Sequence, residues 1–181
     1  MLAVAALTCT TLAAPPAVAA VAAPAGIDAV KQAVTERIDK RLEALKRFGT
    51  TLAEAKQVQP AHRETLTKLL ADQTAGLTAL RAKVQSETTR QAVRADARSM
   101  VTDYRVFMLT GPKVRLTAAI DTQLVAAEKL NADEVTGALS GKVDALLAVK
   151  PGPDGEALRA AVKPVRAAAK DARTALKALR K

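Results

Sequence analysis

The chain has 181 residues and is 49% hydrophobic but only 2% aromatic, with no tryptophan, one tyrosine and two phenylalanines. Much of the apolar content is alanine, which is too small to fill a β-sandwich or barrel, and the other abundant residues are strong helix formers. The composition therefore predicts an all-α protein of about one ordinary domain. The formal net charge of +10 predicts an anionic partner.

The first 26 residues, MLAVAALTCTTLAAPPAVAAVAAPAG, contain no charged side chain. An apolar run is followed by Ala/Pro-rich sequence with Ala-x-Ala sites at 17–19 and 20–22, so we expect residues 1–22 to be a signal peptide, although the basic n-region is missing. Pro15 and Pro16 break the run too early for a membrane-spanning helix. The protein is therefore predicted to be secreted or associated with the cell envelope. A disordered Ala/Pro leader is the alternative.

Cys9 is the only cysteine and lies in this leader. The three preceding residues, Ala-Leu-Thr, form a poor lipobox, so lipidation is the weaker alternative. If the leader is removed, the mature protein has neither a disulfide nor a thiol.

Two long helices are predicted next. Apolar residues recur every three or four positions over 27–57 and again over 60–85, where Pro60 suits the first turn. The short connection makes the two helices an antiparallel, coiled-coil-like hairpin. A third helix is expected over about 90–109. Its predicted inward side chains are Val93, Ala97, Met100, Val101, Tyr104, Phe107 and Met108.

Gly111-Pro112 interrupts this pattern, and either a break or a kink fits. The apolar periodicity then continues to Leu130, so 27–130 is predicted to be the bundle core. Asn131 followed by Glu134 resembles a helix cap and predicts a short helix over 131–149. Its Gly137 and Gly141 either form a close-packing face or weaken the helix, since each Gly costs roughly 1 kcal/mol against Ala. The composition of 150–156, KPGPDGE, predicts a linker.

Residues 157–181 are predicted to form a basic amphipathic helix. Residues 151–181 carry half of the net charge of +10. Apolar residues fall at 158, 162, 165, 169, 172, 176 and 179. A series of cations repeats with the same alternating three- and four-residue spacing, so the helix is predicted to have an apolar stripe and a separate basic stripe. Pro164 is expected to kink the helix or to mark the start of its straight part. The candidate anion-binding residues are Lys163, Arg166, Lys170, Arg173, Lys177, Arg180 and Lys181.

Five large aliphatic residues bury too little area to order such a helix alone, so it needs a partner surface. The nearest is the bundle itself, in which case the cations form only a solvated face. An anionic envelope polymer suits an exported protein best. A membrane surface is the second candidate, although the apolar stripe lacks Trp and Phe anchors. Nucleic acid is disfavoured because no groove-reading motif or stacking aromatic accompanies the cations.

Nothing in the sequence predicts catalysis. His62, the only histidine, lies in the first turn of its helix, where an exposed or capping role is expected. The acidic residues mostly lie four positions from a cation and are interpreted as surface pairs. No phosphate loop, nucleophile elbow or metal-ligand spacing is present. We therefore expect no enzyme activity, catalytic residue, metal or cofactor. The stretch 99–116 is interpreted as core, with a ligand groove lined by soft side chains as the alternative.

Three stretches over about residues 37–116 are RIDKRLEALKRF, LLADQTAGLTALRAKVQSET and DARSMVTDYRVFMLTGPKVRL. They resemble an uncharacterised family of secreted helical bacterial proteins, with an Arg/Leu-rich first helix, a GL-x-x-L-x-x-K second helix and a V-x-x-Y-R-V segment before Pro-Lys. The resemblance implies export and an all-α fold. It implies no activity and no functional residues, and the tail lies outside it.

Together these features predict an exported, non-enzymatic interaction or structural protein of the bacterial envelope or extracellular space. Its basic C-terminal helix would contact anionic surfaces, and its helices could support oligomerisation. One alternative is an extracytoplasmic chaperone-like binder of apolar segments. The other is a non-specific nucleic-acid-binding protein, which requires that the leader is not a signal.

Overall fold

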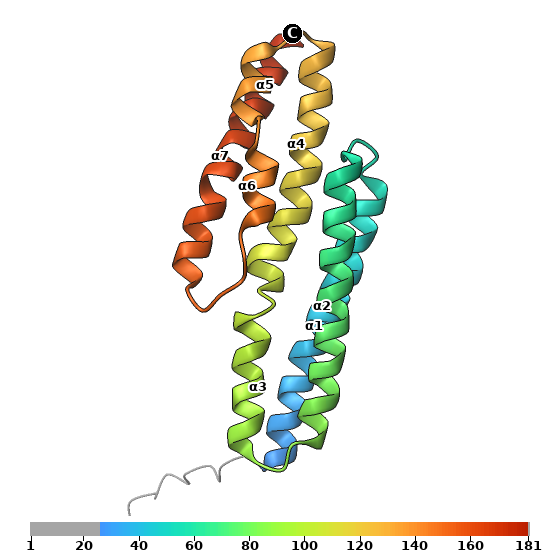
Figure 1. Cartoon of the computed structure of the whole chain (residues 1–181), viewed down its shortest axis with the longest axis vertical. Helices are drawn as coiled ribbons and strands as arrows, with labels where there is room; N and C mark the ends of the chain where they lie inside the picture. Colours follow the sequence, from blue (N-terminus) through green and yellow to red (C-terminus); the bar gives the residue numbers. More distant parts are fainter. Residues whose placement is uncertain (1–25, 181) are drawn as a thin grey trace, which may run out of the picture.

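The structure, a computed structural model, describes residues 26–180. Within that range the chain is helical and contains no strand, and the helices form an elongated bundle (Figure 1). The predicted all-α fold is therefore confirmed. The expected signal peptide, residues 1–22, and the cation Lys181 lie outside the described residues.

The first part of the bundle is the predicted hairpin. Helix α1 (Ile27–Glu54) runs antiparallel to α2 (Pro60–Ser86), and α3 (Arg90–Thr102) packs against both. These helices enclose the first hydrophobic core. Helix α4 (Gly111–Lys129) contributes Val114 to it. The deeply buried side chains of this core include Ile38, Leu45, Leu66, Leu77, Val84, Val93, Met100 and Val114.

The third helix ends earlier than its apolar periodicity predicts. Helix α3 stops at Thr102, and Arg105 adopts a left-handed conformation with φ of 46°. A π-helical turn, η1 (Val106–Thr110), then leads directly into α4. The expected break or kink at Gly111-Pro112 is wrong, because Gly111 is helical and Pro112 occupies the first turn of α4, a position that proline tolerates.

A buried glutamine stabilises this change of direction. Gln73 of α2 donates from Nε2 to the Tyr104 carbonyl oxygen at 2.9 Å, and its Oε1 accepts from the Thr110 hydroxyl at 2.8 Å. Gly111 permits a close approach beside it, since a Cβ there would lie 2.7 Å from the Phe48 ring. The break after α3 is thus fixed by contacts with α1 and α2.

The second part of the bundle packs on the rest of α4. Helices α5 (Asp133–Leu139), α6 (Lys142–Ala148) and α7 (Gly155–Leu179) lie beside it and enclose a second core (Figure 1). Helix α4 therefore belongs to both cores. The second core includes Leu109, Ile120, Ala127, Val135, Leu139, Val143 and Leu146 together with the apolar side of α7.

The single short helix expected over 131–149 is two helices. The chain turns at Ser140 and Gly141, and Gly141 has a φ of +66°, which favours glycine. A Cβ on either Gly137 or Gly141 would meet nothing within 4 Å, so these glycines form no close-packing face. Asn131 does not cap α5 either: it adopts a φ of 52° after α4, and Ala132 precedes α5 without a side-chain cap.

The segment 150–156 and the residues just before it are held by two cations from the middle of the chain. Arg105 donates to the carbonyl oxygens of Gly152 and Pro153. The buried Lys113 donates from Nζ to those of Leu147 and Val149, at 2.8 and 2.6 Å, and its burial lowers its pKa. The predicted linker is therefore anchored to the bundle by hydrogen bonds, and it determines where α7 begins.

Candidate anion-binding surface

Helix α7 docks on the bundle through its apolar stripe. Leu158, Val162, Val165, Ala169, Ala172 and Leu176 are buried in the second core. Only the last member of the predicted stripe, Leu179, is exposed, at 56%. The opposite side of the helix therefore faces outward along its whole length.

Six candidate cations lie along one edge of that outward side, and we call them the basic row. Each follows a residue of the apolar stripe by one position and is therefore about 100° from it around the helix. They are Lys163, Arg166, Lys170, Arg173, Lys177 and Arg180, and all six are exposed. From the first to the last the row covers about 25 Å, at 1.5 Å per helical residue. The seventh candidate, Lys181, cannot be placed because it lies outside the described residues.

The N-terminus of α7 is fixed by a side-chain cap. Asp154 accepts from the backbone N–H groups of Glu156 and Ala157 at 2.8 and 3.0 Å. These two bonds, Ala157 first, lower the pKa of the Asp154 carboxyl group. The helix then continues through Pro164 without a break. Both Pro164 and Ala160, whose carbonyl loses its usual N–H partner, are exposed, so water can satisfy that carbonyl.

The basic row makes no ion pair or side-chain hydrogen bond within residues 26–180. Elsewhere in that range Arg47 pairs with Glu43, Lys68 with Asp72 and Arg81 with Asp39, whereas other exposed cations such as Lys40 and Lys46 are also without an ion pair. Like charges three and four residues apart on a helix repel one another. Repulsion within the row works against α7, while the helix dipole favours Lys177 in the last turn. The row thus presents a line of exposed positive charge without an acidic partner in the described residues.

Phe107 lies next to the basic row, although its predicted position was the core. Its side chain is 53% exposed, and the Arg41 guanidinium lies 5.4 Å from the ring centroid. The ring borders a hollow of about 380 Å³ that also includes three α7 cations, Arg159, Lys163 and Arg166. The left-handed turn at Arg105 and the π turn change the register, so that Val106 and Leu109 point inward and Phe107 outward.

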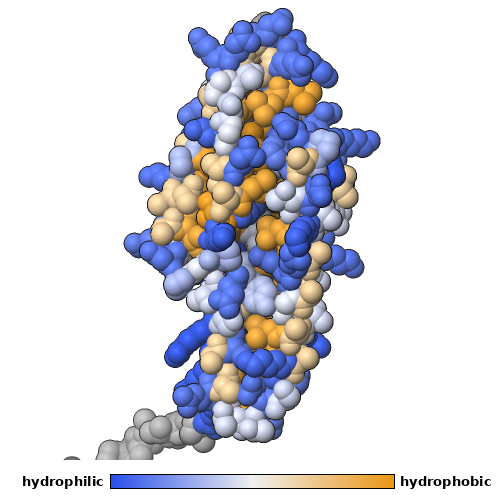
Figure 2. Space-filling view, viewed as in Figure 1, coloured by the Kyte–Doolittle hydropathy of each residue, from blue (hydrophilic) through white to orange (hydrophobic). Residues whose placement is uncertain are grey.

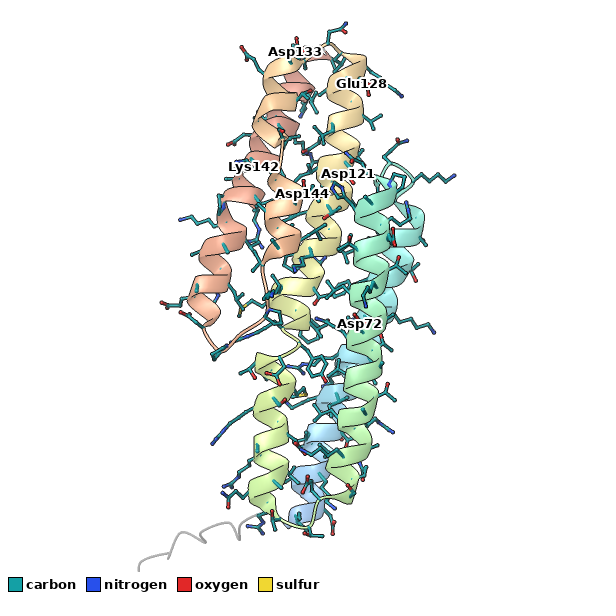
Figure 3. The ribbon with its side chains drawn as sticks, viewed as in Figure 1. Asp72, Asp121, Glu128, Asp133, Lys142 and Asp144 are labelled. Atoms are coloured by element: carbon teal, nitrogen blue, oxygen red, sulfur yellow. The ribbon has the colours of Figure 1, made fainter. Side chains whose placement is uncertain are left out.

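His62 is also placed differently from its expected exposed or capping role. Its side chain is only 13% exposed, and its Nδ1 lies 3.0 Å from Oδ2 of the fully buried Asp121. Its Nε2 lies 3.5 Å from an Asp144 oxygen, and Asp121 also accepts from the Gln59 backbone N–H at 2.9 Å. Figure 3 shows Asp121 on α4 and Asp144 on α6. His62 thus links three helices, α2, α4 and α6.

The acidic residues were expected to form surface pairs, and this is wrong for Asp121 and Asp96, both of which are buried. Asp96 pairs with Lys83 at 2.6 Å.

Among residues 26–180, no three His, Cys, Asp or Glu side chains come together as a metal site would require. Within the same range, no helix combines the length and the hydropathy needed to cross a membrane. Figure 2 shows a mostly hydrophilic face with hydrophobic side chains along the seams between helices.

The fold and this surface define a class, an all-α bundle with a cationic outer helix. Comparisons find no protein family, no curated protein and no solved structure that matches the chain. The resemblance to secreted helical bacterial proteins therefore stays a prediction.

Proposed function

We propose that this is an exported, non-enzymatic protein of the bacterial envelope or extracellular space that binds a linear anionic polymer along the basic row. The observation that carries the proposal is the row itself: six exposed cations on one face of α7, none of them in an ion pair within the described residues. An extended polyanion can follow such a row and relieve the repulsion between its members.

The docking of α7 favours a polymer over a membrane surface. An interfacial helix inserts its apolar stripe into lipid. Here that stripe fills the second core, and each large aliphatic side chain removed from it would cost about 1.5–3 kcal/mol. A polymer needs only the cations, which are already exposed. Phe107, beside three α7 cations, adds a ring on which an apolar face of a polymer unit can rest.

The two alternative functions, a chaperone-like binder and a nucleic-acid-binding protein, have less support. A chaperone-like binder would offer apolar stripes to its clients, whereas the stripes of α1, α2 and α7 are buried in the two cores. The large exposed hydrophobic side chains of residues 26–180 are Phe107 and Leu179. Nucleic acid would use the same cations as the polymer and depends on a leader that is not a signal.

Neutralisation of the row is the appropriate test, because deletion of α7 would open the second core. The six row residues are changed together to Gln. A control variant changes six other exposed cations to Gln, so that the net charge falls equally. The control positions are Lys40, Lys46, Lys56, Arg94, Arg98 and Lys129.

Each protein is tested for co-sedimentation with purified bacterial cell wall, before and after chemical removal of its anionic polymer, across a salt series. We expect the wild type and the control to bind intact wall, binding to fall with salt, and the row variant to bind at least tenfold more weakly. Equal binding by the row variant and the control would contradict the proposal. Anionic vesicles and DNA serve as parallel arms, and a preference for either would reassign the partner.

A further inference from the structure

A groove runs between α4 and the C-terminal half of α7. Its volume is about 610 Å³, within the range of small-molecule sites. Small side chains leave it hollow: Ala118, Ala119 and Ala126 of α4 line it together with Leu176 of α7. The groove therefore offers an apolar floor that a hydrocarbon chain can cover.

Three cations form the α7 side of this groove. Arg173, Lys177 and Arg180 line it, and no acidic side chain does. All three are exposed, and none makes an ion pair within the described residues. A ligand that fits both parts of the groove has an apolar body and an anionic end.

Gln123 gives the groove a fixed wall. Its Nε2 donates to the Ala169 carbonyl oxygen at 2.9 Å, which ties α4 to α7 beside the groove. Its Oε1 is buried without a hydrogen-bond partner. Buried acceptors are rarely left unsatisfied, so a ligand hydroxyl near the anionic group would have a partner here after a small movement of the amide.

We propose that this groove binds a single acyl chain with an anionic, hydroxyl-bearing headgroup, the chain lying on the alanines and the headgroup lying against Arg173, Lys177 and Arg180. The inference does not require the polymer site, although the two share these three cations. A bound amphiphile would offset part of the charge at this end of the row and leave Lys163, Arg166 and Lys170 open.

The probe is lysophosphatidylglycerol, titrated below its critical micelle concentration into the full chain and followed by calorimetry. Glycerophosphoglycerol supplies the headgroup without the chain, and a monoacylglycerol supplies the chain without the charge. We expect saturable binding of lysophosphatidylglycerol, and binding at least tenfold weaker for each of the other two. If glycerophosphoglycerol binds as tightly as the full probe, the cations act alone and the groove proposal is overturned.

Two kinds of variant locate the site. Ala126→Leu fills the groove, and Thr122→Glu adds a negative charge at an exposed lining position. The matched control is Thr78→Glu, at another exposed helical threonine that makes the same hydroxyl bond to the carbonyl four residues earlier.

We expect both groove variants to bind the probe at least tenfold more weakly and Thr78→Glu to stay within twofold of the wild type. An unchanged affinity in Thr122→Glu would overturn the proposal even if Ala126→Leu failed to fold. Wall binding by Ala126→Leu is measured in parallel. If Ala126→Leu still binds the wall but no longer binds the probe, the groove and the polymer site are separate. The polymer site alone is tested by the row variant, which is expected to lose wall binding.

Discussion

Tyr104 lies directly against Gly76. A Cβ on Gly76 would lie 2.6 Å from the Tyr104 hydroxyl oxygen and 2.8 Å from ring atom Cε1, closer than real Cβ contacts. Tyr104 lies two residues after the end of α3. Its backbone carbonyl accepts a hydrogen bond from Gln73, which lies about one turn before Gly76 on α2. The glycine in α2 therefore makes room for the ring at the point where the chain changes direction.

Gly76→Ala is expected to lower the free energy of unfolding by roughly 1–3 kcal/mol, because the added methyl group displaces a packed ring. The matched change is Gly49→Ala in α1, where a Cβ meets nothing within 4 Å. That variant should gain up to about 1 kcal/mol from helix propensity. Urea denaturation compares the two. If Gly76→Ala is as stable as Gly49→Ala, the close contact does not exist in solution.

Asp121→Ala is expected to lower the free energy of unfolding by roughly 1–3 kcal/mol, since it leaves the Gln59 N–H and the His62 ring without their acceptor. Asp72→Ala is the control, because Asp72 lies on the surface and pairs with the exposed Lys68. Its effect should stay below about 1 kcal/mol. Chemical denaturation measures both, and similar small losses would show that the His62–Asp121 link contributes little.

Pro164→Ala is expected to raise the melting temperature, because alanine restores the N–H that can bond to the Ala160 carbonyl inside α7. The gain in unfolding free energy should be at most about 3 kcal/mol. Pro60 lies in the first turn of α2, where no helical hydrogen bond is missing, so Pro60→Ala should leave the melting temperature nearly unchanged. A thermal melt followed by circular dichroism distinguishes them. Equal behaviour of the two variants would mean that α7 does not continue through residue 164.

Asp154→Ala is expected to show a stability deficit that depends on pH. The folded-state pKa of Asp154 lies below its ordinary value, because the Ala157 and Glu156 N–H groups donate to its carboxylate. The cap therefore contributes fully above the ordinary aspartate pKa of about 4, and its contribution is lost as the pH falls through the lower folded pKa. The deficit should be present at pH 7 and should shrink in acid.

Thr89→Ala is the matched control for this cap. Thr89 caps α3 by accepting from the Ala92 N–H through an uncharged hydroxyl. Its loss should cost about 1 kcal/mol at any pH at which the protein is folded. Denaturation of both variants between pH 3 and 7 tests the pair, and a pH-independent deficit in Asp154→Ala would contradict the assigned cause.

The sequence by itself determined the all-α class, the hairpin of the first two helices and the two faces of α7. Periodicity is a local property, because side chains three and four residues apart share a helix face whatever lies beyond. For this reason the hairpin of α1 and α2 and the buried stripe from Leu158 to Leu176 could be predicted, and so could the outward direction of the basic row.

Only the tertiary structure decided where the helices end and which residues from distant parts of the chain come into contact. The left-handed turn at Arg105 depends on Gln73, more than thirty residues away in sequence, and it turns Phe107 out of the core. The partner of His62 comes from α4, and the groove joins α4 to α7. Such contacts follow from the packing of separate helices, and residue spacing along one helix carries no information about them.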